Sequence, residues 1–459
     1  MSRRSQLKVA LESLWRLAPP GPKNLYSSPE FKALSEACAG YGGGKSVFGL
    51  GTALRSLGLP SGLPPRPRAD SLPVETALSA LDKALTRRTT VRRYLCPLDL
   101  AAPLPPLQFG KARVQRFSAA DLATMLDAPV LGRYYPNAAF EPERLALFQW
   151  LVVEERVRID HRPEARAMPF LYEGFDRDTG AFDPHRGAYP EAVETALFFL
   201  LQAPWEDWST YPQVDWRGFR IPWIHTVDED LFVRPSAPPN ADSLTLEPWI
   251  TYDHHGEEEE LETTTALPLD DAAATLADWT EAKWKAHERA CRGALLRTPV
   301  AHFLVRGFAE DGMDEVMAHM TCIEAALGTE ADHFRWLRPK TEPAPYSATD
   351  RVGARITALL DDAEAALAYK ALFDLRSTFV HGRGGLAAVS TVQRVAARRL
   401  ARRVAAALTD LGAVSARSRD AVLATLLVEG RARFLAAITA RDEAALQASA
   451  AETTEPNPL

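Results

Sequence analysis

The residues with the clearest potential for chemistry are an arginine and a histidine in the segment LRSTFVHGR, Leu375 to Arg383. Arg376 borders the apolar side of a predicted helix, and His381 lies where Gly382 would end that helix. Histidine exchanges a proton near neutral pH, and the planar donors of arginine stabilise negative charge. The pair could therefore supply a general base and an anion-binding group. The competing interpretation is structural, with Arg376 in an ion pair and His381 at a helix end, where a cation is favourable.

The spacing of the two residues does not by itself bring their side chains together. Five steps of about 100° leave His381 roughly 140° around the helix from Arg376. The two groups can cooperate only if the helix distorts near its end, or if a second copy of the chain supplies the missing half.

A carboxylate on another predicted helix is the first candidate for a partner of Arg376. Glu324 lies in MAHMTCIEAALG, on one helical face with the apolar residues Met313, Met317, Met320 and Leu327. A buried carboxylate is unfavourable unless a cation or several donors pair with it. Arg376 would be such a cation. The alternative is that the apolar stripe is tilted and that Glu324 lies at its edge.

A glycine-rich segment near the N-terminus invites a nucleotide-binding interpretation. AGYGGGKS (Ala39 to Ser46) fits the loose pattern of a phosphate-binding loop, in which backbone amides surround phosphates and Lys45 meets their charge. Such a loop follows a buried strand, whereas the preceding EFKALSEAC predicts an amphipathic helix. A flexible loop is therefore the favoured interpretation, and an NTP-binding protein is the weakest functional hypothesis.

The other histidines give weaker signals. His254 and His255 stand beside many carboxylates in YDHHGEEEELE, but adjacent residues of a strand point to opposite sides and rarely share a metal. His225 could meet Asp228 or Asp230, although a histidine among aromatic residues is more often a satisfied core residue. We predict no metal site and no cofactor.

The composition of the whole chain limits the classes of function. Its 459 residues carry a net charge of −7, so any nucleic-acid site must be a local basic patch. The proportions of hydrophobic and charged residues are those of ordinary globular domains. The four cysteines are far apart and predict neither a disulfide framework nor a zinc ribbon. No apolar run approaches the length of a membrane span, and we predict a cytoplasmic protein.

The elements that must position these residues divide the chain into two kinds of structure. We predict an α+β multidomain fold, in which a mixed α/β or β-rich N-terminal domain precedes an all-α C-terminal bundle. LFQWLVVEERVRID predicts a strand, or a helix that runs into one, and the aromatic segment around His225 predicts short strands. The predicted segments are a helical and Gly/Pro-rich segment (1–84), a mixed α/β sensor or recognition domain (85–252), an acidic linker (253–269), a helical bundle (270–440) and a disordered tail (441–459).

Helical periodicity dominates the chain from about residue 270. Apolar stripes at helical spacing predict helices around 313–327, 352–360 and 368–379. VQRVAARRLARRVAAALTDLG predicts a fourth helix that ends at Gly412, and Ser418 is a plausible N-cap for a fifth.

The C-terminal pattern resembles a known domain family. Arg376-x4-His381, preceded by ALFDL and followed by Gly382, resembles the R-x4-6-H motif of HEPN domains and is most similar to the Apea-like branch. The upstream MDEVMAHMTCIEAALG resembles the helix of that branch that runs toward an acidic residue. The resemblance covers roughly residues 275–440, and residues 1–270 resemble no family that we can name.

The resemblance implies a helical bundle that forms a homodimer and, in many HEPN proteins, a metal-independent ribonuclease of bacterial toxin or antiviral systems. In those proteins two motifs face one another across the dimer. His381 would activate the ribose 2′-OH and Arg376 would stabilise the scissile phosphate, leaving a 2′,3′-cyclic phosphate. Ser377, Glu324 and Gly382 would support the site. The RNA backbone would be held by Arg383, Arg394, Arg398 and Arg402, whose alternative role is a solvated face that balances the acidic linker.

Ser377 departs from the pattern of the active nucleases. Those enzymes often carry Asn, Asp or His directly after the arginine, and a serine cannot orient a phosphate as an amide does. The rival hypothesis is therefore a catalytically inert HEPN bundle that dimerises or binds RNA. Under either hypothesis, the N-terminal domain would sense a phage or cellular trigger or select the substrate.

Overall fold

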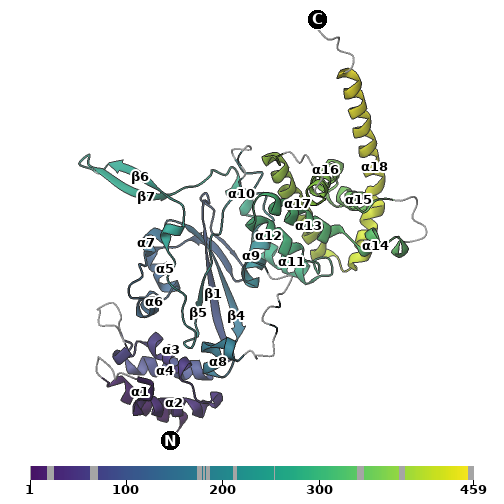
Figure 1. The fold of residues 1–459 in the computed structure, drawn as a ribbon. Helices are drawn as coiled ribbons and strands as arrows, with labels where there is room; N and C mark the ends of the chain where they lie inside the picture. Colours follow the sequence, from purple (N-terminus) through teal and green to yellow (C-terminus); the bar gives the residue numbers. More distant parts are fainter. Residues whose placement is uncertain are drawn as a thin grey trace. The chain divides into compact units, whose positions relative to one another are not determined.

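The computed structural model describes residues 2–17, 25–62, 71–172, 178, 181, 187–209, 214, 216–252, 254–338, 346–381 and 388–452. The fold is mixed α+β, as predicted, with a five-stranded sheet and a helical C-terminal region (Figure 1). The chain divides into two compact units. The first comprises residues 1–106, 111–182 and 220–266, and the second comprises residues 107–110, 183–219 and 267–459.

The first unit begins with a small helical layer. Its helices are α1 (Arg3–Trp15), α2 (Pro29–Cys38), α3 (Phe48–Leu57) and α4 (Val74–Thr86). The side chains of Ser2 and Ser28 cap α1 and α2 by accepting hydrogen bonds from backbone N–H groups of the first turn. Leucines at helical spacing on α1, α3 and α4 form one buried cluster. The predicted helical segment 1–84 corresponds to this layer.

The first unit continues with four antiparallel strands in the order β3-β4-β1-β5. They are β1 (Thr89–Leu98), β3 (Ala112–Arg116), β4 (Gln149–Arg158) and β5 (His225–Asp228), and the remaining strand, β2 (Leu107–Phe109), is assigned to the second unit. The predicted strand LFQWLVVEERVRID is β4, which pairs with β1 over ten residues, from Thr89 opposite Arg158 to Leu98 opposite Gln149. One face packs against the short helices α5 (Ala119–Met125), α6 (Ala128–Tyr134) and α7 (Pro142–Leu145).

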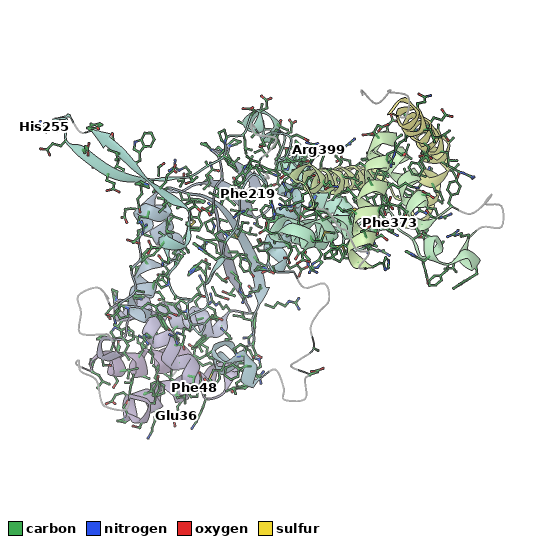
Figure 2. All side chains as sticks on the ribbon, turned by 45° about the horizontal axis from the view of Figure 1, so that its top comes forward. Glu36, Phe48, Phe219, His255, Phe373 and Arg399 are labelled. Atoms are coloured by element: carbon green, nitrogen blue, oxygen red, sulfur yellow. The ribbon has the colours of Figure 1, made fainter. Side chains whose placement is uncertain are left out.

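The acidic segment 253–269 was predicted to be a linker, and this prediction is wrong for its centre. Residues Glu258–Thr264 form strand β7, which pairs antiparallel with β6 (Leu246–Tyr252) in a separate two-stranded sheet. The side chains are mostly exposed, and Figure 2 shows His255 at the turn between the two strands. Three carboxylates of β7, those of residues 258–260, lie opposite the β-branched and aromatic residues 250–252 of β6, whose strand propensity overrides the loop signal of the glutamates.

The second unit is helical. Its helices are α9 (Glu191–Leu200), α10 (Ala272–Leu276), α11 (Glu281–Arg292), α12 (Val300–Ala309), α13 (Gly312–Leu327), α14 (Glu330–His333), α15 (Ala348–Leu360), α16 (Ala363–Val380), α17 (Thr391–Val414) and α18 (Arg419–Glu452). Helix α13 packs against α12 and α17, and α15 packs against α16 and α18. The predicted boundary at residue 270 lies close to the last change of unit at 266–267, but the unit also includes 107–110 and 183–219.

Two predicted ends of helices differ from the structure. Helix α17 continues through Gly412 to Val414, and a Cβ at Gly412 would lie 3.3 Å from Cβ of Ala290, so this glycine permits close helix packing. The tail predicted to be disordered from 441 is helical as far as Glu452. Ser418 caps α18 as predicted, because its hydroxyl accepts a hydrogen bond from the N–H of Ala421.

Within the described ranges, no helix combines the length and apolar character needed to cross a membrane.

Candidate functional site

The predicted site lies at the C-terminal end of α16. The carboxylate of Asp362 caps the other end by accepting a hydrogen bond from the N–H of Ala365 at 3.0 Å. Ala365, Leu367, Tyr369 and Leu372 are buried, whereas the side chains of the last turn are half-buried or exposed. The helix therefore brings Arg376 to the edge of the bundle, while His381 stands at its end.

Glu324 and Arg376 meet, as the sequence suggested. Arg376 Nη1 donates a hydrogen bond of 2.9 Å to Glu324 Oε1, from α16 to α13. The side chains are 28% and 29% exposed, respectively, so the pair is partly shielded from solvent. The Arg376 guanidinium also lies 5.7 Å from the ring centroid of Phe373, which is labelled in Figure 2. This cation–π contact and the ion pair together restrict the orientation of the guanidinium.

Partial burial affects the ionisation of the groups around this pair. Burial raises the pKa of Glu324 above its usual range, although the positive charges of Arg376 and His333 oppose that rise. Burial, and then the charge of Glu324, raise the pKa of Tyr369. Arg376 Nε is buried and has no hydrogen-bond partner within the described part of the chain. The guanidinium therefore retains donor capacity beyond its bond to Glu324.

His381 is separate from this pair in the single chain. It is exposed at the C-cap of α16, and its backbone N–H donates to the carbonyl of Ser377 at 3.1 Å. The described residues show no bond between its imidazole and Arg376, consistent with the divergence expected from their spacing. Phe379 and Val380, directly before it, are exposed apolar residues. Gly382 and Arg383 lie outside the described residues.

The three arginines expected to form an exposed row on α17 have different surroundings. Arg398 and Arg402 are only 7% and 9% exposed. Arg394 and Arg398 both bind the carboxylate of Glu315, and Arg402 binds Glu206 and Asp207. The predicted exposure is therefore wrong, because the segment 187–209 and helix α13 supply carboxylates that cover this face of α17. Their geometry assigns these arginines to internal ion pairs.

Glu315 is the most deeply buried charged residue that sequence reasoning missed. Its carboxylate is fully buried and accepts hydrogen bonds from Arg217, Arg394 and Arg398. His319 lies one helical turn further along α13, and burial, then the charges of Arg398 and Arg217, lower its pKa well below the usual value. Small residues follow Glu315 at helical spacing. The local sequence, however, has no feature that distinguishes Glu315 from a carboxylate at the surface.

The glycine-rich loop does not have the geometry of a phosphate-binding loop. It follows helix α2, and the N–H groups of Val47, Phe48 and Gly49 at the start of α3 donate to the carboxylate of Glu164 at 3.0–3.1 Å. The hydroxyl of Ser46 also donates to Glu164, at 2.6 Å. An internal carboxylate thus occupies the anion-binding position of this helix end. Glu164 was not identified from the sequence, because it is 115 or more residues from these donors.

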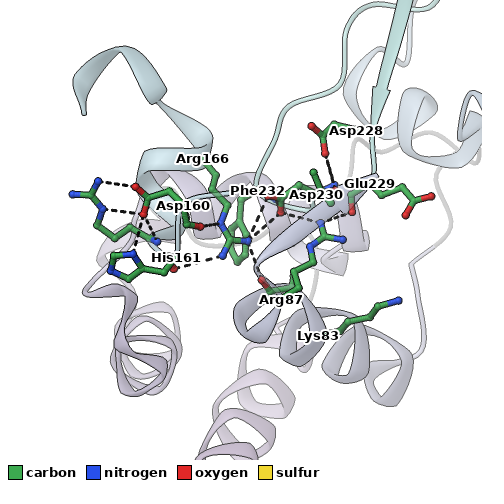
Figure 3. Close-up of polar contacts among 12 residues, drawn as sticks. Lys83, Arg87, Asp160, His161, Arg166, Asp228, Glu229, Asp230 and Phe232 are labelled. Carbon is green, nitrogen blue, oxygen red and sulfur yellow. Dashed lines mark hydrogen bonds and ion pairs between the residues drawn. The ribbon is translucent and has the colours of Figure 1, made fainter. Parts of the chain in front are cut away.

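His225 is a buried residue, as the favoured interpretation had it, and does not meet the two carboxylates considered as its partners. Asp228 binds Arg92, and Asp230 binds Arg87 and Arg166, the latter two contacts being shown in Figure 3. Within the described residues, neither carboxylate forms a hydrogen bond or an ion pair with His225. The rings of His254 and His255 lie at the hairpin turn with their centroids 3.7 Å apart and their planes tilted by 45°. Among the residues that the structure describes, no group of three His, Cys, Asp or Glu side chains is placed to hold a metal ion.

Comparisons of this chain with known protein families, with curated proteins and with solved structures find no match. The functional interpretation therefore depends on the geometry described above and on the resemblance of the motif.

Proposed function

We propose that the helical unit is a metal-independent endoribonuclease of HEPN type, acting in bacterial antiviral defence or toxin-like growth arrest. The observation that carries this proposal is the arrangement at the end of α16, where Glu324 holds Arg376 and His381 is exposed five residues later. The rest of the motif resembles that of HEPN domains in residue type and order. The substrate class is RNA, because the chemistry available is suited to attack by a ribose 2′-OH.

The residues would divide the reaction as follows. His381 removes the proton of the 2′-OH, which attacks the adjacent phosphorus. Arg376 donates hydrogen bonds to the non-bridging phosphate oxygens as negative charge increases there. The bond from phosphorus to the 5′-oxygen breaks, leaving a 2′,3′-cyclic phosphate and a 5′-hydroxyl end. Glu324 acts as a positioning residue, since it touches Arg376 and restricts its orientation.

A homodimer would complete this site. Arg376 and His381 diverge on one helix, so a second copy is needed to place an arginine and a histidine on one phosphate. The exposed Phe379 and Val380 next to His381 supply apolar surface that a second copy would cover. Sedimentation equilibrium of the wild type and of Phe379→Asp tests this requirement, and the variant is expected to shift toward monomer and to lose cleavage.

The experiment that tests the function is cleavage of total and structured RNA by the purified full chain in EDTA. Arg376→Ala and His381→Ala are each expected to reduce cleavage by about 100-fold or more while leaving the fold intact. Matched controls are Arg417→Ala and His255→Ala, which alter exposed residues elsewhere. Equal cleavage by all versions would assign the activity to a contaminant and refute the proposal.

A second candidate is an inert bundle that dimerises or binds RNA. The ion pair that already engages Arg376, together with Ser377 in place of an amide residue, favours this alternative. The two candidates differ in a cellular assay. Phage challenge of cells that carry wild type or His381→Ala should give a His381-dependent phenotype for a nuclease, whereas an inert module should tolerate the substitution.

A further inference from the structure

A cavity in the first unit has the features of a small-molecule site. It lies between strand β5, the turn from α5 to α6 and the loop that follows β5. Its volume is about 80 Å³, which is room for several water molecules, and it opens to solvent. Half of the lining residues are apolar, namely Leu126, Val130, Leu131, Val227, Leu231, Val233 and Pro235.

His225 is the buried polar side chain of this cavity. It is 6% exposed, and its cross-strand neighbour Leu95 belongs to the core beneath α5–α7, so the imidazole points to that face. Its ring forms no hydrogen bond or ion pair with any part of the chain that the structure describes. Burial lowers the pKa of His225 to about 4, so the ring is neutral at physiological pH. A neutral imidazole has one donor and one acceptor, and both need a partner when buried.

Asp127 supplies a carboxylate at the α5–α6 turn. Its backbone is left-handed, with φ of 52°, and its Oδ1 accepts a hydrogen bond from the N–H of Val130 at 3.3 Å. Burial raises the pKa of Asp127, although Val130 N–H and Arg133 oppose that rise. The described residues place no basic side chain in an ion pair with Asp127. Asp127 is exposed, so water screens part of its charge, and its carboxylate is accessible to a ligand in the cavity.

The other carboxylates of the lining are already bound. Asp228 is paired with Arg92. Asp230 accepts from Arg87 and Arg166 (Figure 3). Glu229 lies 3.6 Å from Arg93. These ion pairs anchor the loop after β5, so the cavity is preformed rather than assembled on binding. The local charge available to a ligand is thus the negative charge of Asp127.

We propose that this cavity binds a small organic cation, with its apolar body against the aliphatic lining, its ammonium or guanidinium group at Asp127, and a hydrogen bond to His225. The carboxylate disfavours phosphates and carboxylic acids. The bound cation would pair with the carboxylate of Asp127, which forms no ion pair within the described residues, and would give the His225 ring a hydrogen-bond partner. This site is independent of the proposed ribonuclease site.

The test uses the full chain and three probes of similar size. These are 2-phenylethylamine, the neutral 2-phenylethanol and the anionic 3-phenylpropanoate, measured by isothermal titration and thermal shift. The amine is expected to bind at least about tenfold more tightly than the alcohol, because its hydrogen bond to Asp127 is charge-assisted. Asp127→Asn should remove that preference while keeping a good helix cap and tolerance of left-handed backbone. His225→Phe should weaken both the amine and the alcohol.

Two controls locate the site. Glu143→Gln removes an exposed carboxylate of α7 and should leave all affinities unchanged. The His225 imidazole resonances in NMR spectra of the wild type should shift when the amine is added, a readout that needs no substitution. No binding by the amine, tighter binding of the anion, or amine binding that is insensitive to Asp127→Asn and silent at His225 would each overturn the proposal.

Discussion

Burial of Glu324 disfavours its ionised form, whereas the positive charge of Arg376 favours that form. The net effect raises the pKa of Glu324, so the folded protein holds this proton more tightly than the unfolded chain. Stability from this group is present below the unfolded pKa and is lost as pH rises through the folded pKa. At pH values above the folded pKa, the ionised carboxylate is less favourable to folding than its neutral form would be.

This sign gives a prediction for two substitutions. Glu324→Gln is neutral and keeps an oxygen acceptor for Arg376, so its free energy of unfolding at pH 7 should equal or slightly exceed that of the wild type. Glu324→Ala should lose about 1–2 kcal/mol, because Arg376 then lacks its acceptor. Urea unfolding at pH 7 measures both, with Asp374→Asn on the exposed face of α16 as the control. If Glu324→Gln lowered the free energy of unfolding as much as Glu324→Ala does, the raised pKa of Glu324 would be contradicted.

Glu164 provides the second prediction at this scale. It accepts hydrogen bonds from three backbone N–H groups at the start of α3 and from the Ser46 hydroxyl. Glu164→Ala should therefore lower the free energy of unfolding by about 2–4 kcal/mol, because it leaves several donors of a helix end unpaired. Thermal or urea unfolding measures this change. Glu36→Ala, which removes only a 3.9 Å surface contact with Lys45, should stay within about 0.5 kcal/mol of the wild type.

These two carboxylates show what local sequence can indicate. Glu324 and Arg376 each border an apolar helical stripe, so the sequence around each residue indicated that it needed a partner of opposite charge. Glu164 and the loop at Ser46 lie in segments whose contact is created by folding, and a Cβ at Gly49 would lie 2.7 Å from the carbonyl oxygen of Pro163. The spacing of apolar residues within either segment gives no information about such a contact.

At the scale of elements, helix α17 was correctly predicted as a helix, but the face that it buries was not. Its arginine row lies against carboxylates that come from α13 and from residues 206–207. A row of arginines at helical spacing has the same pattern on a surface as in an interior with matching carboxylates. Only the neighbouring elements distinguish the two situations.

The buried cluster around Glu315 should be sensitive to the loss of its carboxylate. Glu315→Ala is expected to lower the free energy of unfolding by about 3–5 kcal/mol, since it leaves the guanidiniums of Arg394 and Arg398 without their shared acceptor. Urea unfolding followed by circular dichroism measures this. The matched control is Glu310→Ala, which removes only an exposed i,i+4 contact with Arg306. Equal effects of the two changes would show that burial of the cluster is not important for stability.

At the scale of the whole molecule, the second unit is discontinuous in sequence. Helix α9 packs on α12, and the indole of Trp279 donates to the carbonyl of Phe199 at 3.1 Å. Arg398 also donates to the carbonyl of Trp216 at 3.0 Å. The segment 183–219 therefore packs against the core of the bundle and supplies hydrogen-bond acceptors for its buried donors.

A comparison of two fragments tests this organisation. Residues 267–459 alone should melt at least about 10 °C lower than residues 183–459, because removal of α9 exposes apolar surface and leaves Arg398 and Arg402 without several partners. Circular dichroism melts provide the measurement. Equal melting temperatures would indicate that the C-terminal bundle is self-sufficient from residue 267.

The sequence by itself determined the mixed α+β character, strand β4, the main helices of the bundle and the first candidate partner of Arg376. These features follow from periodicity, capping residues and the unfavourable burial of an unpaired charge, all of which act locally or on a single face. Tertiary structure alone decided that Glu164 fills the helix end in the glycine-rich segment, that the arginines of α17 are internal, and that residues 183–219 belong with the bundle. Each of these depends on which distant segment supplies the opposing charge, and a helical or strand pattern does not carry that information.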